Sequence, residues 1–464
     1  MDFLAETEGR MDFAALQRSV ALQDWPWVVR SVQAILTEGI ALAEAQQDSM
    51  IESLILALEW GDFQVRWDVA KVLPMLGDRA IEPLLEWLQE EDLDADVQWF
   101  GIRMLGRWAG DAGLNRLLAV LRSGTPDLQA MALSVLIQQG NAILDRILPL
   151  LVTDETRLLA VKILSGIRSR DTLDLLLTVV TDENPEIRTV AIEALSSFQD
   201  ERLGSVFVRA MSDPVTPVRQ TAAMAMGFCQ TLSAFDRTVY LVPLLWDIQL
   251  SVCCCAAHSL GRINHEDSIA ALQKALFSQP LPTLLGLELA RSLFHIGNTV
   301  GYEDAIVGLG AYVMTGMNRS NRSLPSSDSN LDSNLDSSSD FNSDVISEII
   351  RILGRVETPI AKSIALHTVL NCLEQPHLNP IDRTLAITAL GHLKDPRSID
   401  PLIQQLIHPA SSLRLHILHA LQQIDPSVAL DRLQSQFSQS QLSQSPLTDA
   451  LQNGIHFALT EWRS

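Results

Sequence analysis

The chain has 464 residues, 47% of them hydrophobic, and a formal net charge of −22 at pH 7. Binding to phosphate backbones depends on Lys and Arg displacing counterions, so this charge argues against nucleic acid or an anionic membrane and favours partners with basic surfaces. The start of the chain is acidic, no stretch is long and apolar enough for membrane insertion, and the five cysteines form no disulfide framework, so we expect a cytoplasmic protein.

The first part of the chain, residues 1–64, contains a degenerate copy of a pattern that becomes clear further on. Residues 27–36 match this pattern weakly, and an apolar helix is expected over 50–60. We predict that residues 1–64 form an N-terminal helical cap.

A short phrase then recurs along most of the sequence. Its apolar first position sets the register, and successive copies lie 28 to 37 residues apart, with one gap of 60. The anchors are Val65, Val97, Leu128, Thr156, Ile187, Val218, Val252, Leu285, Val345, Asp382 and Leu413. A small residue usually follows four positions later and a Leu or Met eight positions later, which places all three on one side of an amphipathic helix.

Each phrase is followed by a second apolar helix, so each repeat is a helical hairpin. Asn184 and Asn379, like Thr125 and Thr216, precede prolines and offer capping oxygens. Glycines nine positions after the anchor are expected to close the first helix in the left-handed conformation. These glycines are Gly106, Gly227, Gly261, Gly354 and Gly391.

One hairpin cannot bury its apolar faces alone, so the repeats must stack. We predict an all-α fold, a right-handed superhelical solenoid of about eleven to twelve helical hairpins without β-sheet. The array covers residues 65–314 and 345–433, and a Ser/Asn/Asp-rich segment at 315–344 explains the wide gap as a disordered insertion. A Gln/Ser-rich linker at 434–445 and a C-terminal cap helix at 446–464 complete the chain.

Residues 213–227 and 385–396 resemble HEAT repeats of the short type named for phycobilisome lyases. The resemblance covers roughly residues 60–315 and 344–432 and implies a helical solenoid. Such proteins include heterodimeric lyases that attach bilins to phycobiliproteins, deoxyhypusine hydroxylase, and many scaffolds. The resemblance therefore implies an alternative function as a bilin lyase or lyase-like chaperone of phycobilisome subunits, with bilin as a possible ligand and a phycobiliprotein or phycobilisome-associated protein as partner.

An arginine follows the anchor in six repeats: Arg66, Arg157, Arg188, Arg219, Arg383 and Arg414. We expect these arginines to bond to aspartates or helix-end carbonyls of adjacent repeats, for example at Asp182 and Asp213. The alternative is that they hold the propionates of a bilin.

The sequence contains no strong pattern for a metal site or for a catalytic nucleophile. Deoxyhypusine hydroxylase uses several His-Glu pairs, whereas this chain has only His265-Glu266, expected in a turn. His416 and His419 share a helix face, but nothing nearby completes a ligand set. We therefore assign no catalytic residue, no metal site and no cofactor.

The cysteines Cys253, Cys254 and Cys255 are consecutive, so they point in three directions around a helix and cannot bind one metal together. Two of them are expected to fill the core, and His258 is the only local base for a third. Core packing is the preferred interpretation.

Seven of the nine tryptophans lie before residue 110, beside an acidic run at 90–96. Tryptophan is enriched at binding hot spots, although large residues also cap the end of a solenoid. We predict that a partner surface includes Trp60, Trp67, Trp87, Trp99, Trp108, Glu82 and Glu86. The leading functional hypothesis is a non-enzymatic protein-binding scaffold or adaptor that presents an extended, concave, acidic surface to another protein.

Overall fold

The computed structural model describes residues 13–39, 42–88, 93–106, 111–296, 301–320, 342–376, 378–440 and 446–462. Within these ranges every regular element is a helix, which confirms the predicted all-α fold. The chain divides into two compact units, Met1–Phe198 and Gln199–Ser464, which we call unit 1 and unit 2.

The described part of unit 1 begins with a short helix that packs on the next helix. Its α-helices are α1 (Phe13–Ala21), α2 (Trp25–Thr37), α3 (Glu44–Trp60), α4 (Phe63–Val72), α5 (Ile81–Trp87), α6 (Ala95–Leu105), α7 (Asp111–Ser123), α8 (Pro126–Gln138), α9 (Leu144–Val152), α10 (Asp154–Gly166), α11 (Arg170–Val179) and α12 (Pro185–Leu195). Two 3-10 helices, η1 (Leu73–Ala80) and η2 (Gly140–Ile143), precede α5 and α9.

Unit 2 continues the same alternation of helices. Its α-helices are α13 (Leu203–Ala210), α14 (Thr216–Phe228), α15 (Ala234–Leu241), α16 (Leu250–Ile263), α17 (Glu266–Leu276), α18 (Thr283–His295), α19 (Tyr302–Ser320), α20 (Ser343–Leu353), α21 (Pro359–Leu373), α22 (Pro380–Leu393), α23 (Ile399–Gln404), α24 (Ser411–Ile424), α25 (Pro426–Ser440) and α26 (Pro446–Glu461). The 3-10 helices are η3 (Val242–Trp246), η4 (Pro396–Ser398) and η5 (Gln405–Ile407).

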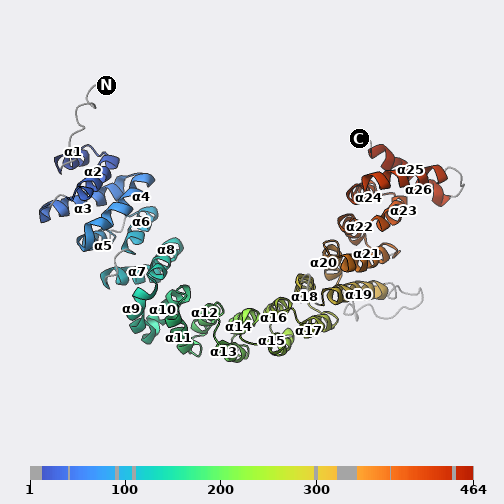
Figure 1. Cartoon of the computed structure of the whole chain (residues 1–464), viewed down its shortest axis with the longest axis horizontal. Coiled ribbons are helices and arrows are strands. Elements are labelled where there is room, and N and C mark those ends of the chain that lie inside the picture. The colour runs from blue at the N-terminus through green and yellow to red at the C-terminus, as the bar shows by residue number, and fades with distance from the viewer. Residues whose placement is uncertain are drawn as a thin grey trace, which may run out of the picture. The chain divides into compact units, whose positions relative to one another are not determined.

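The helices of each unit form two layers. In unit 2 each even-numbered helix from α14 to α24 packs against the next even-numbered helix, and the odd-numbered helices lie along the other side (Figure 1). The even-numbered helices from α2 to α12 stack in the same way within unit 1. Each of the twelve even-numbered helices from α2 to α24 is followed by a second helix in the described chain. This gives twelve helical hairpins, where the sequence predicts about eleven to twelve.

The anchor positions explain why these helices stack. Val218, Val252 and Val345 are fully buried, as are the small residues Ala222 and Ala256 four positions after their anchors. A buried alanine leaves room for the neighbouring helix, so the repeated apolar stripe forms the continuous core of each unit.

The glycines nine positions after the anchors do not close their helices in the left-handed conformation, so that prediction is wrong. Gly106 and Gly354 have φ values of −63° and −65°, which are ordinary helical values. They instead lie where the next even-numbered helix comes closest. A Cβ added to Gly354 would lie 2.8 Å from Cα of Ala389 on α22, and one added to Gly106 would lie 2.5 Å from Cγ1 of Val135 on α8. Such distances require glycine for packing rather than for backbone freedom.

The predicted helix caps form where asparagine precedes proline. Asn184 Oδ1 accepts a bond from the backbone N–H of Glu186 at 2.9 Å, and Asn379 caps α22 in the same way. Thr125 makes no side-chain cap bond, and α14 already begins at Thr216.

The predicted insertion at 315–344 lies between α19 and α20. Helix α19 runs to Ser320, so the first six residues of that range are helical, whereas 321–341 lie outside the described residues. Helix α20 packs on α18, and Arg291 of α18 pairs with Glu348 of α20 at 3.1 Å. The array of unit 2 therefore continues across this position.

The C-terminal end is closed by α26, which packs on α24, α25 and η5. Helix α25 runs to Ser440, so part of the predicted linker at 434–445 is helical, and 441–445 lie outside the described residues.

A helix that crosses a membrane must be both long and apolar. No single helix in the described ranges is long and apolar enough to cross a membrane. The pair Pro126–Gln138 and Gly140–Val152 meets the criteria only when the two are taken together, and they are bent by 102° at their junction.

Candidate functional site

Two neighbouring helices of unit 1, α4 and α6, bring four aromatic rings together. Phe63 and Trp67 lie one turn apart on α4 and stack with ring centroids 6.2 Å apart. Phe100 of α6 contacts both rings at 5.5 and 6.5 Å and contacts Trp99 at 5.0 Å. Phe100 is 2% exposed, whereas Phe63 is 67% exposed. We call these four residues the aromatic cluster; it runs from the core of unit 1 to its surface.

Two cations flank this cluster. The guanidinium carbon of Arg103 lies 4.9 Å from the ring centre of Trp67 and 5.5 Å from that of Trp99, and Nζ of Lys71 lies 6.0 Å from the Trp67 ring. These distances suit cation–π attraction. The cations border a hollow of about 280 Å³ lined by Trp67, Ala70, Lys71, Arg103, Gly106 and Gln138.

The charges at this hollow are only partly balanced. Lys71 donates a hydrogen bond to Asp68 at 2.9 Å, and Gln64 donates to the same carboxylate at 3.0 Å. These bonds lower the pKa of Asp68 below its ordinary value, so it stays ionised and compensates Lys71. No carboxylate within the described ranges pairs with Arg103, which leaves its charge available to a ligand.

The structure separates the predicted tryptophans. Trp67 and Trp99 meet through Arg103, and Trp60 is 66% exposed at the end of α3. Trp87 is 4% exposed, so its ring packs in the core instead of facing a partner. Trp108 falls in 107–110, outside the described residues.

The predicted carboxylates do not join the aromatic cluster. Glu82 and Glu86 are exposed on α5, in the layer of odd-numbered helices, whereas the cluster belongs to the even-numbered layer. Phe63, Lys71 and Arg103 were missed as site residues. Their spacing was a usable signal, because each lies four residues from Trp67 or Trp99 and therefore one helical turn away.

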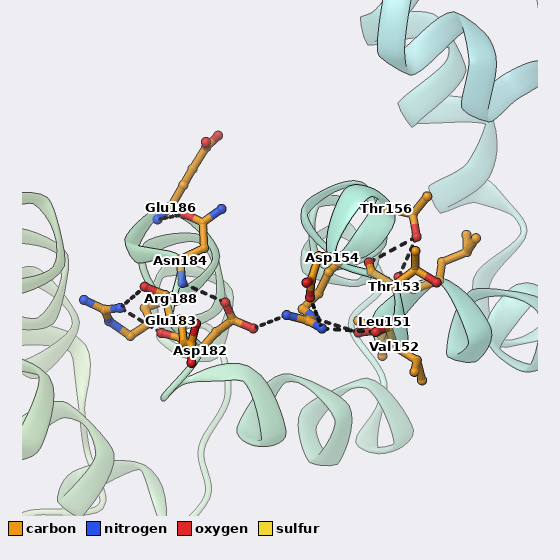
Figure 2. Close-up of polar contacts among 12 residues, drawn as sticks. Leu151, Val152, Thr153, Asp154, Thr156, Asp182, Glu183, Asn184, Glu186 and Arg188 are labelled. Atoms are coloured by element: carbon orange, nitrogen blue, oxygen red, sulfur yellow. Dashed lines mark hydrogen bonds and ion pairs between the residues drawn. The ribbon is translucent and has the colours of Figure 1, made fainter.

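The recurrent arginines serve the stacking of repeats. Arg157 donates to the carbonyl of Val152 at 3.1 Å, at the end of the preceding helix, and to the carboxylate of Asp182 at 3.1 Å, before the next repeat. Figure 2 shows the next arginine, Arg188, beside Asp182 and Glu183, whose carbonyls accept its bonds at 2.7 and 3.1 Å.

The remaining arginines of this column behave alike. Arg66, Arg383 and Arg414 all donate to carbonyls at the end of the preceding helix, and Arg219 donates to the carbonyl of Asp213. Even Cys253, which replaces the arginine in its repeat, donates to the carbonyl of Asp247 at 3.2 Å. The prediction that these arginines bond to aspartates or helix-end carbonyls is confirmed. Their guanidinium groups are therefore already hydrogen-bonded within the protein.

The three consecutive cysteines have the properties of packed thiols. Cys253 is buried, and Cys254 and Cys255 are half-buried. Burial, with a smaller contribution from Glu288, raises the pKa of Cys254 to about 11 and also raises that of Cys255. At neutral pH these thiols are protonated and therefore poor nucleophiles.

The histidines with possible metal spacing make other contacts. His265 caps α17 by accepting a bond from the backbone N–H of Asp267 at 3.3 Å, and His419 bonds to Gln423 at 3.0 Å. In the part of the chain that the structure describes, no group of three or more His, Cys, Asp and Glu side chains is arranged to hold a metal ion.

The even-numbered helices of unit 2, from α14 to α24, carry slightly more basic than acidic residues. They carry six arginines against four carboxylates, a balance of +2, together with five histidines. The arginines are Arg219, Arg262, Arg291, Arg351, Arg383 and Arg414; the carboxylates are Glu288, Asp344, Glu348 and Asp382; the histidines are His258, His295, His392, His416 and His419. The negative charge of the chain therefore lies elsewhere.

Comparison with known proteins supports the repeat. Residues 144–227 and 366–445 match the family model of HEAT repeats, so the chain contains HEAT repeats in these two stretches. No curated protein matches the sequence.

Solved structures resemble this chain only at low sequence identity and low TM-score. Importin beta is 12% identical with a TM-score of 0.46 over 97% of this chain, which spans 64% of that chain. An engineered protein is 18% identical with a TM-score of 0.34, covering 93% of this chain and 99% of its own. The complex of CpcE and CpcF of phycocyanin lyase from Nostoc sp. PCC7120 is 17% identical with a TM-score of 0.28, covering 62% of this chain and 94% of that chain. None of these similarities bears on the function of this chain.

Proposed function

We propose that this HEAT-repeat protein is a non-enzymatic scaffold or adaptor, and that the aromatic cluster of α4 and α6 with Arg103 is a docking site for a partner protein. The observation that carries the proposal is the position of Arg103 between the rings of Trp67 and Trp99, 4.9 and 5.5 Å from their centres. Tryptophan and arginine are the residues most enriched at binding hot spots.

The chemistry of the cluster specifies the partner. Exposed Phe63 and Trp60 offer apolar area, and Arg103, which pairs with no carboxylate among the described residues, favours a carboxylate of the partner. A partner segment that places an apolar side chain against the rings and an acidic side chain against Arg103 would satisfy both. The proposal places the protein in the cytoplasm and requires no cofactor.

The second candidate is a bilin lyase or lyase-like chaperone of phycobilisome subunits, which rests on the sequence resemblance. No contact among the described residues favours it. Co-expression with a bilin and an apo-phycobiliprotein subunit separates the two functions, because only a lyase leaves stable covalent colour on the subunit.

The docking site is tested by affinity capture from native lysate, followed by titration of the captured partner against purified variants. We expect Trp99→Ala and Arg103→Gln each to weaken the partner's affinity by about tenfold or more, because loss of a hot-spot side chain typically costs more than about 1.4 kcal/mol.

Trp246→Ala is the matched control, since Trp246 is a 50% exposed tryptophan of unit 2 and does not belong to the cluster. It should leave the affinity unchanged. Thermal melting followed by circular dichroism confirms that each variant is folded. Equal affinity of Trp99→Ala, Arg103→Gln and the original protein would rule out this docking site.

A further inference from the structure

The exposed side of α3 carries a continuous ridge of side chains spaced four residues apart. We call it the α3 ridge; its members are Glu44, Asp48, Glu52, Leu56 and Trp60. The opposite side of α3 is buried against α2, α4 and α5. Ridges with this spacing are the surfaces through which helices pack on one another. The α3 ridge is therefore an unpartnered packing surface in the odd-numbered layer of unit 1 (Figure 1).

The second half of the ridge is apolar. Leu56 is 38% exposed, and Trp60, one turn further along the helix, is 66% exposed. Exposed apolar side chains that border charged ones are typical of interaction surfaces. Tryptophan is also enriched at binding hot spots, because its large ring buries much area. This half of the ridge therefore favours an apolar contact with a partner.

The first half of the ridge is acidic, and the fold of α3 does not explain why. Carboxylates four residues apart on a helix repel each other and destabilise it. Asp48 stands in such a pair with Glu44 on one side and with Glu52 on the other, and α3 contains no lysine or arginine. A cation supplied from outside the helix would relieve this repulsion.

Cations of the protein compensate only the first of these carboxylates. Arg79 of η1 pairs with Glu44 at 3.4 Å, and Glu44 lies in the first turn, where the positive end of the helix dipole offsets its charge. Arg66 bonds to carbonyls at the opposite end of α3. Neither Asp48 nor Glu52 forms an ion pair within the described residues. The middle of the ridge therefore keeps two negative charges without a cation.

The neighbouring helix adds charges of the same sign. Helix α5 packs on α3, and its charged residues, Glu82 and Glu86, are both exposed. The sequence predicts a partner surface at these two carboxylates, and neither belongs to the aromatic cluster. A surface of one sign beside exposed apolar side chains selects a partner with the complementary pattern.

We propose that the α3 ridge docks a helical segment of another protein that carries lysines or arginines and, further along the same face, apolar side chains. The basic side chains pair with Asp48 and Glu52, and the apolar ones pack against Leu56 and Trp60. This proposal goes beyond the docking site on α4 and α6, does not depend on it, and shares only Trp60 with it.

Two labelled peptides of about 18 residues, long enough to run beside α3, are the probes. Each has lysines four residues apart in one half and leucines four residues apart in the other, on a background of alanine and glutamine. The lysines occupy the N-terminal half of one peptide and the C-terminal half of the other, so both directions of docking are covered. Fluorescence anisotropy is followed as the full chain is added at constant pH and ionic strength.

We expect one of the two peptides to saturate a single site on the chain. The double variant Asp48→Asn with Glu52→Gln should weaken its binding about fivefold or more, because two charge pairs are lost. Trp60→Ala should weaken it by a similar factor, because a hot-spot ring is lost. Arg103→Gln should retain binding, so failure of this proposal can be told from failure of the docking site on α4 and α6.

The matched control is Glu155→Gln with Glu193→Gln, which removes two exposed charges from unit 1 outside α3 and should retain binding. Melting curves followed by circular dichroism establish that all variants are folded. The proposal is overturned if neither peptide saturates a site, or if both pairs of carboxylate substitutions weaken binding equally, which would indicate diffuse attraction. A dimer of the free chain that Trp60→Ala abolishes in analytical ultracentrifugation would assign the ridge to a second copy and also overturn it.

Discussion

Arg219 joins three segments of unit 2 through one guanidinium group. Its Nε and Nη2 each donate to Asp247 at 2.8 Å, and its Nη1 donates to the carbonyl of Asp213 at 2.9 Å. The side chains of Arg219 and Asp247 are 11% and 13% exposed, so water screens the pair weakly. The hydrogen bonds from Arg219 are the main reason that the pKa of Asp247 lies below its ordinary value.

Replacing this carboxylate should be measurable. We expect Asp247→Asn to lower the free energy of unfolding by about 1.5–3 kcal/mol at pH 7, the range for hydrogen bonds to charged groups. Because the folded pKa is depressed, the stabilisation is complete above the unfolded pKa of about 3.9 and is lost as the pH falls through the lower folded value. Urea denaturation should therefore show a constant difference between the two proteins from about pH 7 to pH 5, and a shrinking one below about pH 4.

Arg397→Gln serves as the control for an exposed pair. Arg397 is 62% exposed and contacts Asp395 two residues away, so solvent screens this pair and its loss should change the free energy of unfolding very little. If Asp247→Asn were no more destabilising than Arg397→Gln, the buried pair would not stabilise the stacking of α14 and α16.

At the scale of helices, glycine sets the distance between neighbouring repeats. Gly106 on α6 faces Val135 on α8, and Gly261 on α16 faces Ser292 on α18 in the equivalent register. In both pairs a methyl group on the glycine would overlap the next helix. The column of glycines therefore determines how closely the even-numbered helices pack.

A double-mutant cycle tests this role at α6 and α8. Gly106→Ala gains helix propensity of up to about 1 kcal/mol, yet we expect a net loss of about 1–2 kcal/mol from overpacking against Val135. Val135→Ala alone leaves a cavity, and the double variant should be more stable than the sum of the single effects predicts, because the smaller side chain makes room for the new methyl group. Additive unfolding free energies would show that the two residues do not compete for the same space.

At the scale of the whole molecule, contacts that bypass 321–341 hold unit 2 together. Helix α18 packs on α20, helix α19 packs on α21, and Asn342 donates a hydrogen bond to Thr283. The Ser, Asn and Asp content of residues 315–344 predicts an insertion, and residues 321–341 of that range lie outside the described residues. Continuity of the helical array should then not depend on an unbroken chain at this point.

Cleavage at this position provides the test. A specific protease site inserted after Ser333 should be cut rapidly in the native protein, and the two fragments should remain together in gel filtration with an almost unchanged melting temperature. The protein without the inserted site is the control and should stay intact under the same digestion. Separation of the fragments after cleavage at Ser333 would show that the packing of α18 on α20 is too weak to hold them.

The repeat, the all-α fold and the role of the arginine column could all be predicted from the amino-acid sequence. All three depend on periodic features that are local in the chain: an anchor such as Val218, the arginine after it, and a proline or asparagine at the helix start. Helical periodicity specifies which face is buried, and a hairpin with one apolar face has to stack. The sequence also indicated Trp67 and Trp99 as candidates, through their concentration near one end.

Which residues of different repeats lie side by side depends on how the helices stack. Trp87 and Trp99 lie twelve residues apart, yet one is buried in the core and the other borders Arg103. Arg262 and Ser292 lie thirty residues apart and line one hollow. Contacts between successive repeats depend on the rotation and spacing of stacked helices, which no local pattern encodes. For the same reason the glycines that suggest helix ends in the sequence prove to be the points where neighbouring helices touch.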